Sequence, residues 1–111
     1  MKKEIILDFT CEEAALLINV FTAYLENVNT LQLKLPAIDI VADEIDFVDE
    51  SLPLLKDGVA LEIGVILQCP VAIKHVLFAL ALLTASLTTE ETDTLNTQCM
   101  IKLLYASRGG R

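Results

Sequence analysis

The chain has 111 residues, of which 54% are hydrophobic and 22% are charged, and its mean hydropathy is +0.57. This apolar content excludes a disordered chain, because disordered chains lack the hydrophobic side chains that offset the entropy of ordering. Sixteen acidic and eight basic residues give a formal net charge of −8, so we expect neither nucleic acid nor a membrane as a partner.

We expect a single domain over residues 1–111, opened by a short strand or an extended lead-in over residues 1–9. The apolar run in this opening is brief, because Glu4 and Asp8 interrupt it. A secretory signal peptide needs a longer uninterrupted apolar region. We therefore expect a cytoplasmic protein.

A capping box formed by Thr10 and Glu13 predicts the start of a first helix. The helix should end before Pro36, because the residue before a proline avoids helical geometry. A helix over residues 11–35 would be about 37 Å long. It should therefore either span the whole domain or break near residues 27–30. Its apolar seam repeats at spacings near 3.5 and consists of Ala14, Ile18, Phe21, Leu25, Val28, Leu31 and Leu35.

Pro36 suits the first position of a second helix, which should end at the turn Leu52-Pro53. A further turn signal follows in Lys56-Asp57-Gly58. The apolar stripe of this helix consists of Ile38, Val41, Ile45, Val48 and Leu52. Residues 59–68 alternate as a strand would, but they also fit helical spacing, and we favour a helix there.

Residues 70–87 predict a helix that is apolar on nearly every face. Its uncharged part, residues 76–87, is shorter than the roughly 20 residues that a membrane-spanning helix needs. Such a helix lies at the centre of the domain, or a second copy of the chain covers one face. A second capping box over residues 88–91 predicts the start of the last helix, and residues 108–111 predict a flexible tail.

Together these patterns predict an all-α or mostly-α bundle of four to five helices, with or without a short N-terminal strand. The predicted apolar faces exceed what one small bundle easily covers. We therefore expect a homo-oligomer.

The second predicted helix carries an acidic stripe, with six acids and no bases in residues 37–50. The six are Asp39, Asp43, Glu44, Asp46, Asp49 and Glu50. Like charges at these spacings each cost an isolated helix about 0.2–0.5 kcal/mol. Three interpretations stay open: a solvated face that keeps an apolar chain soluble, a docking face for a basic protein, and a divalent-cation site. The cation site is the least favoured, because no EF-hand loop or di-iron motif is present.

Residues that carry other chemistry are few. Cys11, Cys69 and Cys99 form no CxxC pair, and we expect them to be small core residues in a reducing compartment. His75 is the only histidine, and we interpret it as a partly exposed structural residue. We expect no catalytic residues, no metal and no cofactor.

The predicted function is therefore a non-enzymatic, acidic interaction module, such as an adaptor, an inhibitor or an immunity-type protein. It would bind a basic protein partner through the acidic face between Asp39 and Glu50. The alternative is a helical protein that binds a small molecule between its helices or at a homo-oligomer interface. That pocket would lie near Phe21, Leu25, Phe78 and Leu82.

Overall fold

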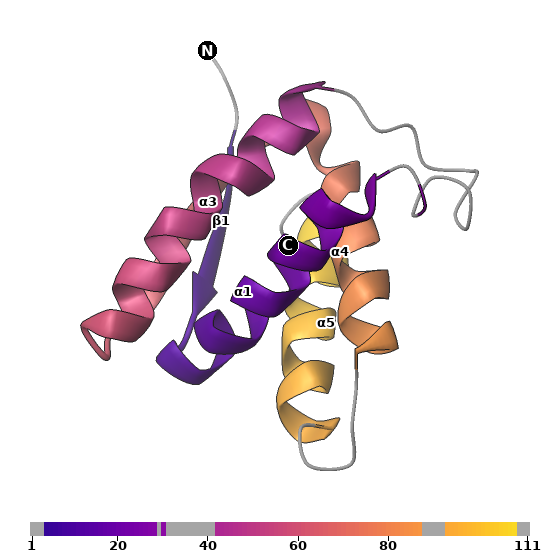
Figure 1. The fold of residues 1–111 in the computed structure, drawn as a ribbon. Coiled ribbons are helices and arrows are strands. Elements are labelled where there is room, and N and C mark those ends of the chain that lie inside the picture. Colours follow the sequence, from indigo (N-terminus) through magenta and orange to yellow (C-terminus); the bar gives the residue numbers. More distant parts are fainter. Residues whose placement is uncertain (1–3, 29, 31–41, 88–92, 109–111) are drawn as a thin grey trace.

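The structure is a computed structural model that describes residues 4–28, 30, 42–87 and 93–108. The described elements follow the order β1 (Glu4–Phe9), α1 (Cys11–Glu26), α3 (Ala42–Ala60), β2 (Val65–Pro70), the 3₁₀ turn η1 (Val71–Ile73), α4 (His75–Ser86) and α5 (Asp93–Ser107) (Figure 1). The fold is mostly α-helical with one short strand near the N-terminus, as the sequence predicts. The second strand, β2, is an addition to that prediction.

The two strands form an antiparallel sheet although residues 10–64 lie between them. Ile5 pairs with Cys69, Leu7 with Leu67, and Phe9 with Val65, and all six side chains are buried. The intervening residues face outward on both strands. The sheet thus has one face in the core and one face open to solvent, as its period-two pattern requires.

Helix α1 begins with the predicted capping box. The Thr10 N–H donates to Glu13 Oε1 at 2.8 Å, and the Glu13 N–H donates to Thr10 Oγ1 at 3.2 Å. The helix ends at Glu26, and the Asn27 N–H closes it on the Ala23 carbonyl at 3.0 Å. The break near residues 27–30 is therefore confirmed. The predicted continuation over 31–35 lies outside the described residues.

The predicted end of the second helix at Pro53 is wrong, because α3 continues through Pro53 to Ala60. The predicted turn over residues 56–58 is helical as well. Proline inside a helix costs about 3 kcal/mol, through its missing N–H and its ring. Here the buried side of the helix continues past the proline with Leu55, and that packing offsets the cost.

The buried face of α3 is also rotated from the predicted apolar stripe. It consists of Glu44, Phe47, Val48, Ser51, Leu55 and Gly58. Within the predicted stripe, Val48 is fully buried, whereas Ile45 and Leu52 are only partly buried. The predicted start at Pro36 and the stripe residues Ile38 and Val41 lie outside the described residues.

The helix favoured for residues 59–68 is wrong: α3 ends at Ala60, and β2 follows from Val65. The chain reverses between them in a Schellman motif. The Ile63 N–H donates to the Gly58 carbonyl at 2.9 Å, and Glu62, at a φ of 57°, occupies the left-handed position of the motif. The local spacing of these residues fits a helix and a strand equally, and the pairing of residues 65–70 with the distant strand β1 selects the strand.

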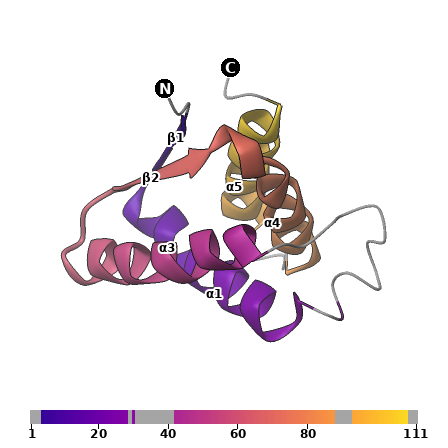
Figure 2. The same ribbon diagram turned by 90° about the horizontal axis from the view of Figure 1, so that it is seen from above.

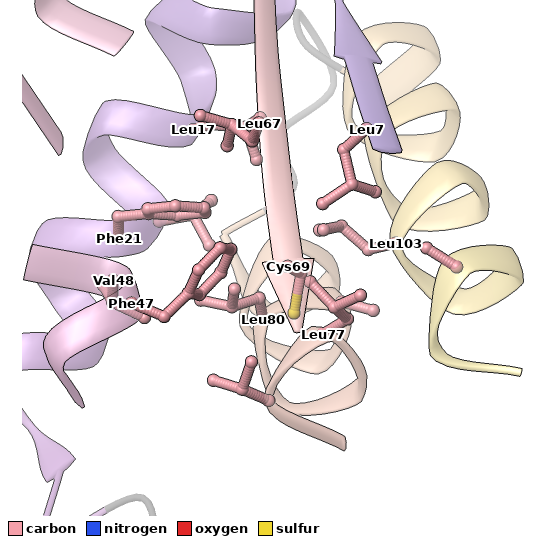
Figure 3. Packing of buried hydrophobic residues seen from close by; sticks show 14 of the residues in the cluster. Leu7, Leu17, Phe21, Phe47, Val48, Leu67, Cys69, Leu77, Leu80 and Leu103 are labelled. Atoms are coloured by element: carbon pink, nitrogen blue, oxygen red, sulfur yellow. The ribbon is translucent and has the colours of Figure 1, made fainter. Parts of the chain in front are cut away.

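Helix α1 lies between α3 on one side and the α4–α5 pair on the other (Figures 1 and 2). The inner face of the sheet packs among these helices, with Leu67 beside Leu17 and with Leu7 and Leu103 on the β1 side (Figure 3). The Asn96 side chain of α5 donates to the Thr84 carbonyl in the last turn of α4 at 3.1 Å. The core is thus shared by all four described helices and both strands.

Helix α4 starts later than predicted, because Pro70 ends β2 and residues 71–73 form a 3₁₀ turn. The helix packs against α1 and α5 and buries half of its twelve side chains, while Phe78 stays exposed. Helix α4 thus packs within the chain on its buried side, and the cover of its exposed face by a second copy stays a prediction. Among the described helices, none is both long enough and apolar enough to cross a bilayer. The predicted capping box at 88–91 and the end of the tail, 109–111, lie outside the described residues.

Candidate interaction groove

Four of the six predicted acidic site residues lie exposed on α3. They are Asp43, Asp46, Asp49 and Glu50. Within the part of the chain that the structure describes, no lysine, arginine or histidine forms an ion pair with any of these four. Asp39 lies outside the described residues. The acidic face is therefore open for its described part.

Glu44 does not belong to this face, and its assignment as a partner-binding residue is wrong. Its side chain is 0% exposed and forms an ion pair with Nε2 of His75, the first residue of α4. The carboxylate shares the inner side of α3 with Phe47 and Val48, so the helix carries it into the core. The contact with His75 gives the buried carboxyl group a polar partner from α4.

The Glu44 carboxylate also acts on two other buried groups. Burial, and then the negative charge of Glu44, raise the pKa of the Tyr24 hydroxyl to about 12. Burial, with the charges of Glu4 and Glu44, likewise raises the pKa of the Cys69 thiol to about 12. Both groups therefore stay protonated at neutral pH. His75 is 46% exposed, in agreement with the expected partly exposed histidine.

A groove of about 590 Å³ lies between α3 and the end of β2. One wall is formed by Asp43, Asp46, Phe47 and Glu50 of α3, and the opposite wall by Gln68, Pro70, Val71, Ala72 and Ile73. Glu4 of β1 completes the lining. A smaller hollow of about 250 Å³ shares Glu4, Phe47, Glu50 and Gln68 with it and adds Ser51, Leu54, Ile66 and Leu67. We call the two together the α3–β2 groove.

The end of the α3–β2 groove that holds Asp43 and Asp46, which we call the acidic end, also has apolar walls, and the other end carries the exposed Leu54 and Ile66. Asp43 and Asp46 line only the larger hollow, and Leu54 and Ile66 line only the smaller one. Glu4 and Glu50 line both. No basic side chain is among the described residues that line the groove, whereas four acidic ones are.

The sequence patterns identified only part of this lining. Asp43, Asp46 and Glu50 were predicted as site residues, whereas Asp49 lies outside the groove. Glu4 was missed, because its place beside α3 depends on the pairing of Glu4 with Pro70 across the sheet. The outward position of Glu4 in an alternating strand was the only local signal that could have indicated it.

The alternative pocket near Phe21 and Phe78 is not among the described hollows. Phe21 is fully buried and packs on Phe47, with the ring centroids 6.5 Å apart. Its side chain fills core volume instead of lining a cavity. Phe47 in turn lines the α3–β2 groove.

Two of the three cysteines lie in the core. Cys69 and Cys99 are buried free thiols, and Cys11 is a half-buried one, as expected for core residues. Burial raises the pKa of Cys99 to about 12. Among the described residues, no three His, Cys, Asp or Glu side chains come together as metal ligands would.

Comparisons of the chain with protein-family models, with curated proteins and with solved structures find no match.

Proposed function

We propose that this chain is a non-enzymatic, acidic interaction protein, of the adaptor, inhibitor or immunity type, that binds a basic surface of another protein in the α3–β2 groove. One observation carries the proposal. Glu4, Asp43, Asp46 and Glu50 converge on one groove from two elements, and no described cation neutralises them.

The energetics of the groove favour a cationic occupant. Like charges three and four residues apart on α3 repel one another by a few tenths of a kcal/mol per pair. Glu4 adds a fourth negative charge from the sheet. Lysine or arginine side chains of a partner would turn this repulsion into attraction and would fix the register of the complex. If the partner uses that basic surface for its own activity, the bound chain would block this activity sterically.

The acids outside the groove would act at longer range. Asp49 is exposed beside the groove and adds to the negative potential of a chain that carries −8 overall. Such a potential speeds the encounter with a basic protein, and the gain falls as salt screens it over about 10 Å. We therefore assign binding contacts to the groove and steering to Asp49.

The test compares two variants that lose the same charge. The groove variant is D43N/D46N/E50Q, and the control variant, E26Q/D57N/E62Q, neutralises three exposed acids outside the groove. Each protein serves as bait in an extract of the native host. We expect a basic protein that the wild type and the control retain, that salt at about 0.5 M releases, and that the groove variant loses. Equal retention by the groove and control variants would contradict the proposal.

A second candidate function follows from the size of the larger hollow. Its roughly 590 Å³ falls in the range of small-molecule sites, and Phe47, Val71 and Ile73 give it apolar walls. A small molecule bound there would be a cation with an apolar body. It would raise the melting temperature of the wild type more than that of D43N/D46N/E50Q.

Two further expectations accompany the proposal. The cytoplasm is the compartment that we propose, because free thiols such as Cys69 and Cys99 persist in a reducing environment.

Self-association of the chain also stays a prediction. The apolar side chains that remain exposed on α4 and α5 include Phe78, Ile101 and Tyr105.

A further inference from the structure

The outer face of the sheet is unusually apolar for a solvent-facing surface. Ile6 of β1 is 59% exposed, and Ile66 of β2 is 62% exposed. Their neighbours on this face are polar: Glu4 and Asp8 on β1, and Gln68 on β2. In a sheet with one wet face, the outward positions are normally polar throughout. The two isoleucines therefore need a separate explanation.

The strand register brings the two isoleucines together. Ile6 pairs with Gln68, and Ile66 pairs with Asp8, so Ile6 and Ile66 are diagonal neighbours on one face. Diagonal neighbours in an antiparallel sheet are close enough for large side chains to form one surface. Single exposed apolar residues are common, but adjacent ones mark contact surfaces more often.

This apolar surface continues into the α3–β2 groove. Ile66 lines the smaller hollow together with Leu54 of α3, which is 51% exposed. Glu4 and Glu50, in the same hollow, join it to the acidic end. Along α3, Asp43 and Leu54 are eleven positions apart, which corresponds to about 16 Å of helix. Acidic and apolar contacts thus lie within the reach of one short peptide segment.

We infer that the occupant of the groove is a basic amphipathic segment of another protein, whose cationic side chains meet Asp43, Asp46 and Glu50 and whose large apolar side chain covers Ile66, Ile6 and Leu54. The inference rests on the proposed function and adds the apolar half of the partner. Charge complementarity selects the basic class of segment. The continuous apolar surface requires an anchor that a purely charged segment lacks, because anchors of this kind carry much of the energy of an interface.

The experiment uses a fluorescein-labelled peptide with three lysines followed by two leucines, and a companion peptide in which glutamine replaces both leucines. Fluorescence anisotropy measures the binding of both peptides to the wild-type chain, to I6T/I66T and to the control I63T/I101T. The control changes two isoleucines that are as exposed but lie outside the groove lining and the outer sheet face. Threonine keeps a β-branched side chain in the strands.

We expect the wild type and the control to prefer the leucine peptide by about tenfold, and I6T/I66T to lose that preference while its salt dependence stays unchanged. Circular dichroism and the urea midpoint establish that I6T/I66T is folded. If it is not, L54Q on α3 replaces it, with the same expectation. A wild type without preference, or a folded I6T/I66T or L54Q that keeps the full preference, overturns the inference.

The groove variant D43N/D46N/E50Q separates the two proposals. If it loses affinity for both peptides while I6T/I66T behaves as wild type, the acidic groove stands and the apolar anchor fails. If it binds both peptides as the wild type does, the proposed function itself fails.

Discussion

Lys102 joins three elements through one ammonium group. Its Nζ donates to Glu13 Oε1 of α1 at 2.6 Å and to the Asp8 carbonyl of β1 at 3.0 Å. The same atom lies 5.5 Å from the centre of the Phe9 ring. Because Glu13 also caps the start of α1, this one cation on α5 holds the cap, the strand and the last helix together.

The pKa of Glu13 follows from these contacts. Burial of the carboxyl raises it, but the hydrogen bonds from Lys102 and Thr10 and the charge of Lys102 together outweigh burial and lower the pKa. A carboxyl whose pKa is lower in the folded than in the unfolded state stabilises the fold above its unfolded pKa. That contribution is lost as the pH falls through the folded pKa.

We predict that K102M lowers the free energy of unfolding by about 1–3 kcal/mol at neutral pH, because it leaves the Glu13 charge without its partner. The difference between variant and wild type should shrink as the pH falls through the lowered folded-state pKa of Glu13, because the carboxyl then takes up a proton in both. Urea denaturation over a series of pH values from neutral to acidic measures it. K56M, which changes an exposed lysine without an ion pair among the described residues, is the control. A difference independent of pH would contradict this assignment.

At this scale, local contacts were predictable and distant ones were not. The hydrogen bonds of Thr10 and Glu13 join residues three apart, so their spacing alone indicates them. Glu44 and His75 come from different helices, and nothing near Glu44 distinguishes it from its exposed neighbours Asp43 and Asp46. The predicted apolar stripe of this helix is shifted by one residue from the observed buried face. The sequence therefore could not show that Glu44, unlike the other acids, lies on the buried side.

At the scale of the elements, Gly58 explains how the end of α3 packs against the start of β2. Gly58 is buried in the last turn of the helix, where a Cβ would collide with the Val65 side chain of β2. Its carbonyl also accepts the hydrogen bond from Ile63 that closes the Schellman motif. The absence of a side chain thus lets the end of α3 lie directly against the start of β2.

We predict that G58A destabilises the fold by about 1–3 kcal/mol, although alanine favours a helix over glycine by about 1 kcal/mol. In the V65A background the same change should cost less, because the colliding methyl groups are gone. A double-mutant cycle from urea denaturation measures this coupling, which we expect to be at least about 1 kcal/mol. Additive effects of the two substitutions would contradict a direct collision.

The elements were predictable where the local signal was clear: the capping box indicated the start of α1, and the short apolar run indicated a strand or an extended lead-in at the N-terminus. Pro53 and the 56–58 segment were misinterpreted, because turn-forming residues reflect local preference, whereas tertiary packing decided α3. Residues 59–68 were ambiguous for a similar reason. A short, mostly apolar segment fits strand and helix alike until its partner strand, Glu4–Phe9, is known.

For the molecule as a whole, the acidic side of the groove was partly predictable and its shape was not. Asp43, Asp46 and Glu50 could be placed on one helix from spacing alone. The opposite wall, Gln68 to Ile73, is brought there by the crossing of the chain from α3 into β2. A groove between two segments that are distant in the sequence leaves no recognisable residue pattern in either segment.

We predict opposite salt dependences for the two kinds of association. Copies that each carry −8 repel one another, so self-association through apolar side chains should increase with salt, whereas binding of a basic partner should weaken. Sedimentation velocity at about 50 mM and 500 mM salt measures the first. A monomer at micromolar concentration under both conditions would contradict the expected homo-oligomer.

The pairing of β1 with β2 also has a consequence for synthesis. At translation rates of about 5–20 residues per second, on the order of 3–12 s pass between Phe9 and Pro70. During that interval Ile5, Leu7 and Phe9 have no strand partner, and the sheet that later conceals them does not exist. A nascent chain of this protein therefore presents three unshielded apolar side chains to the cell before its tertiary structure can close over them.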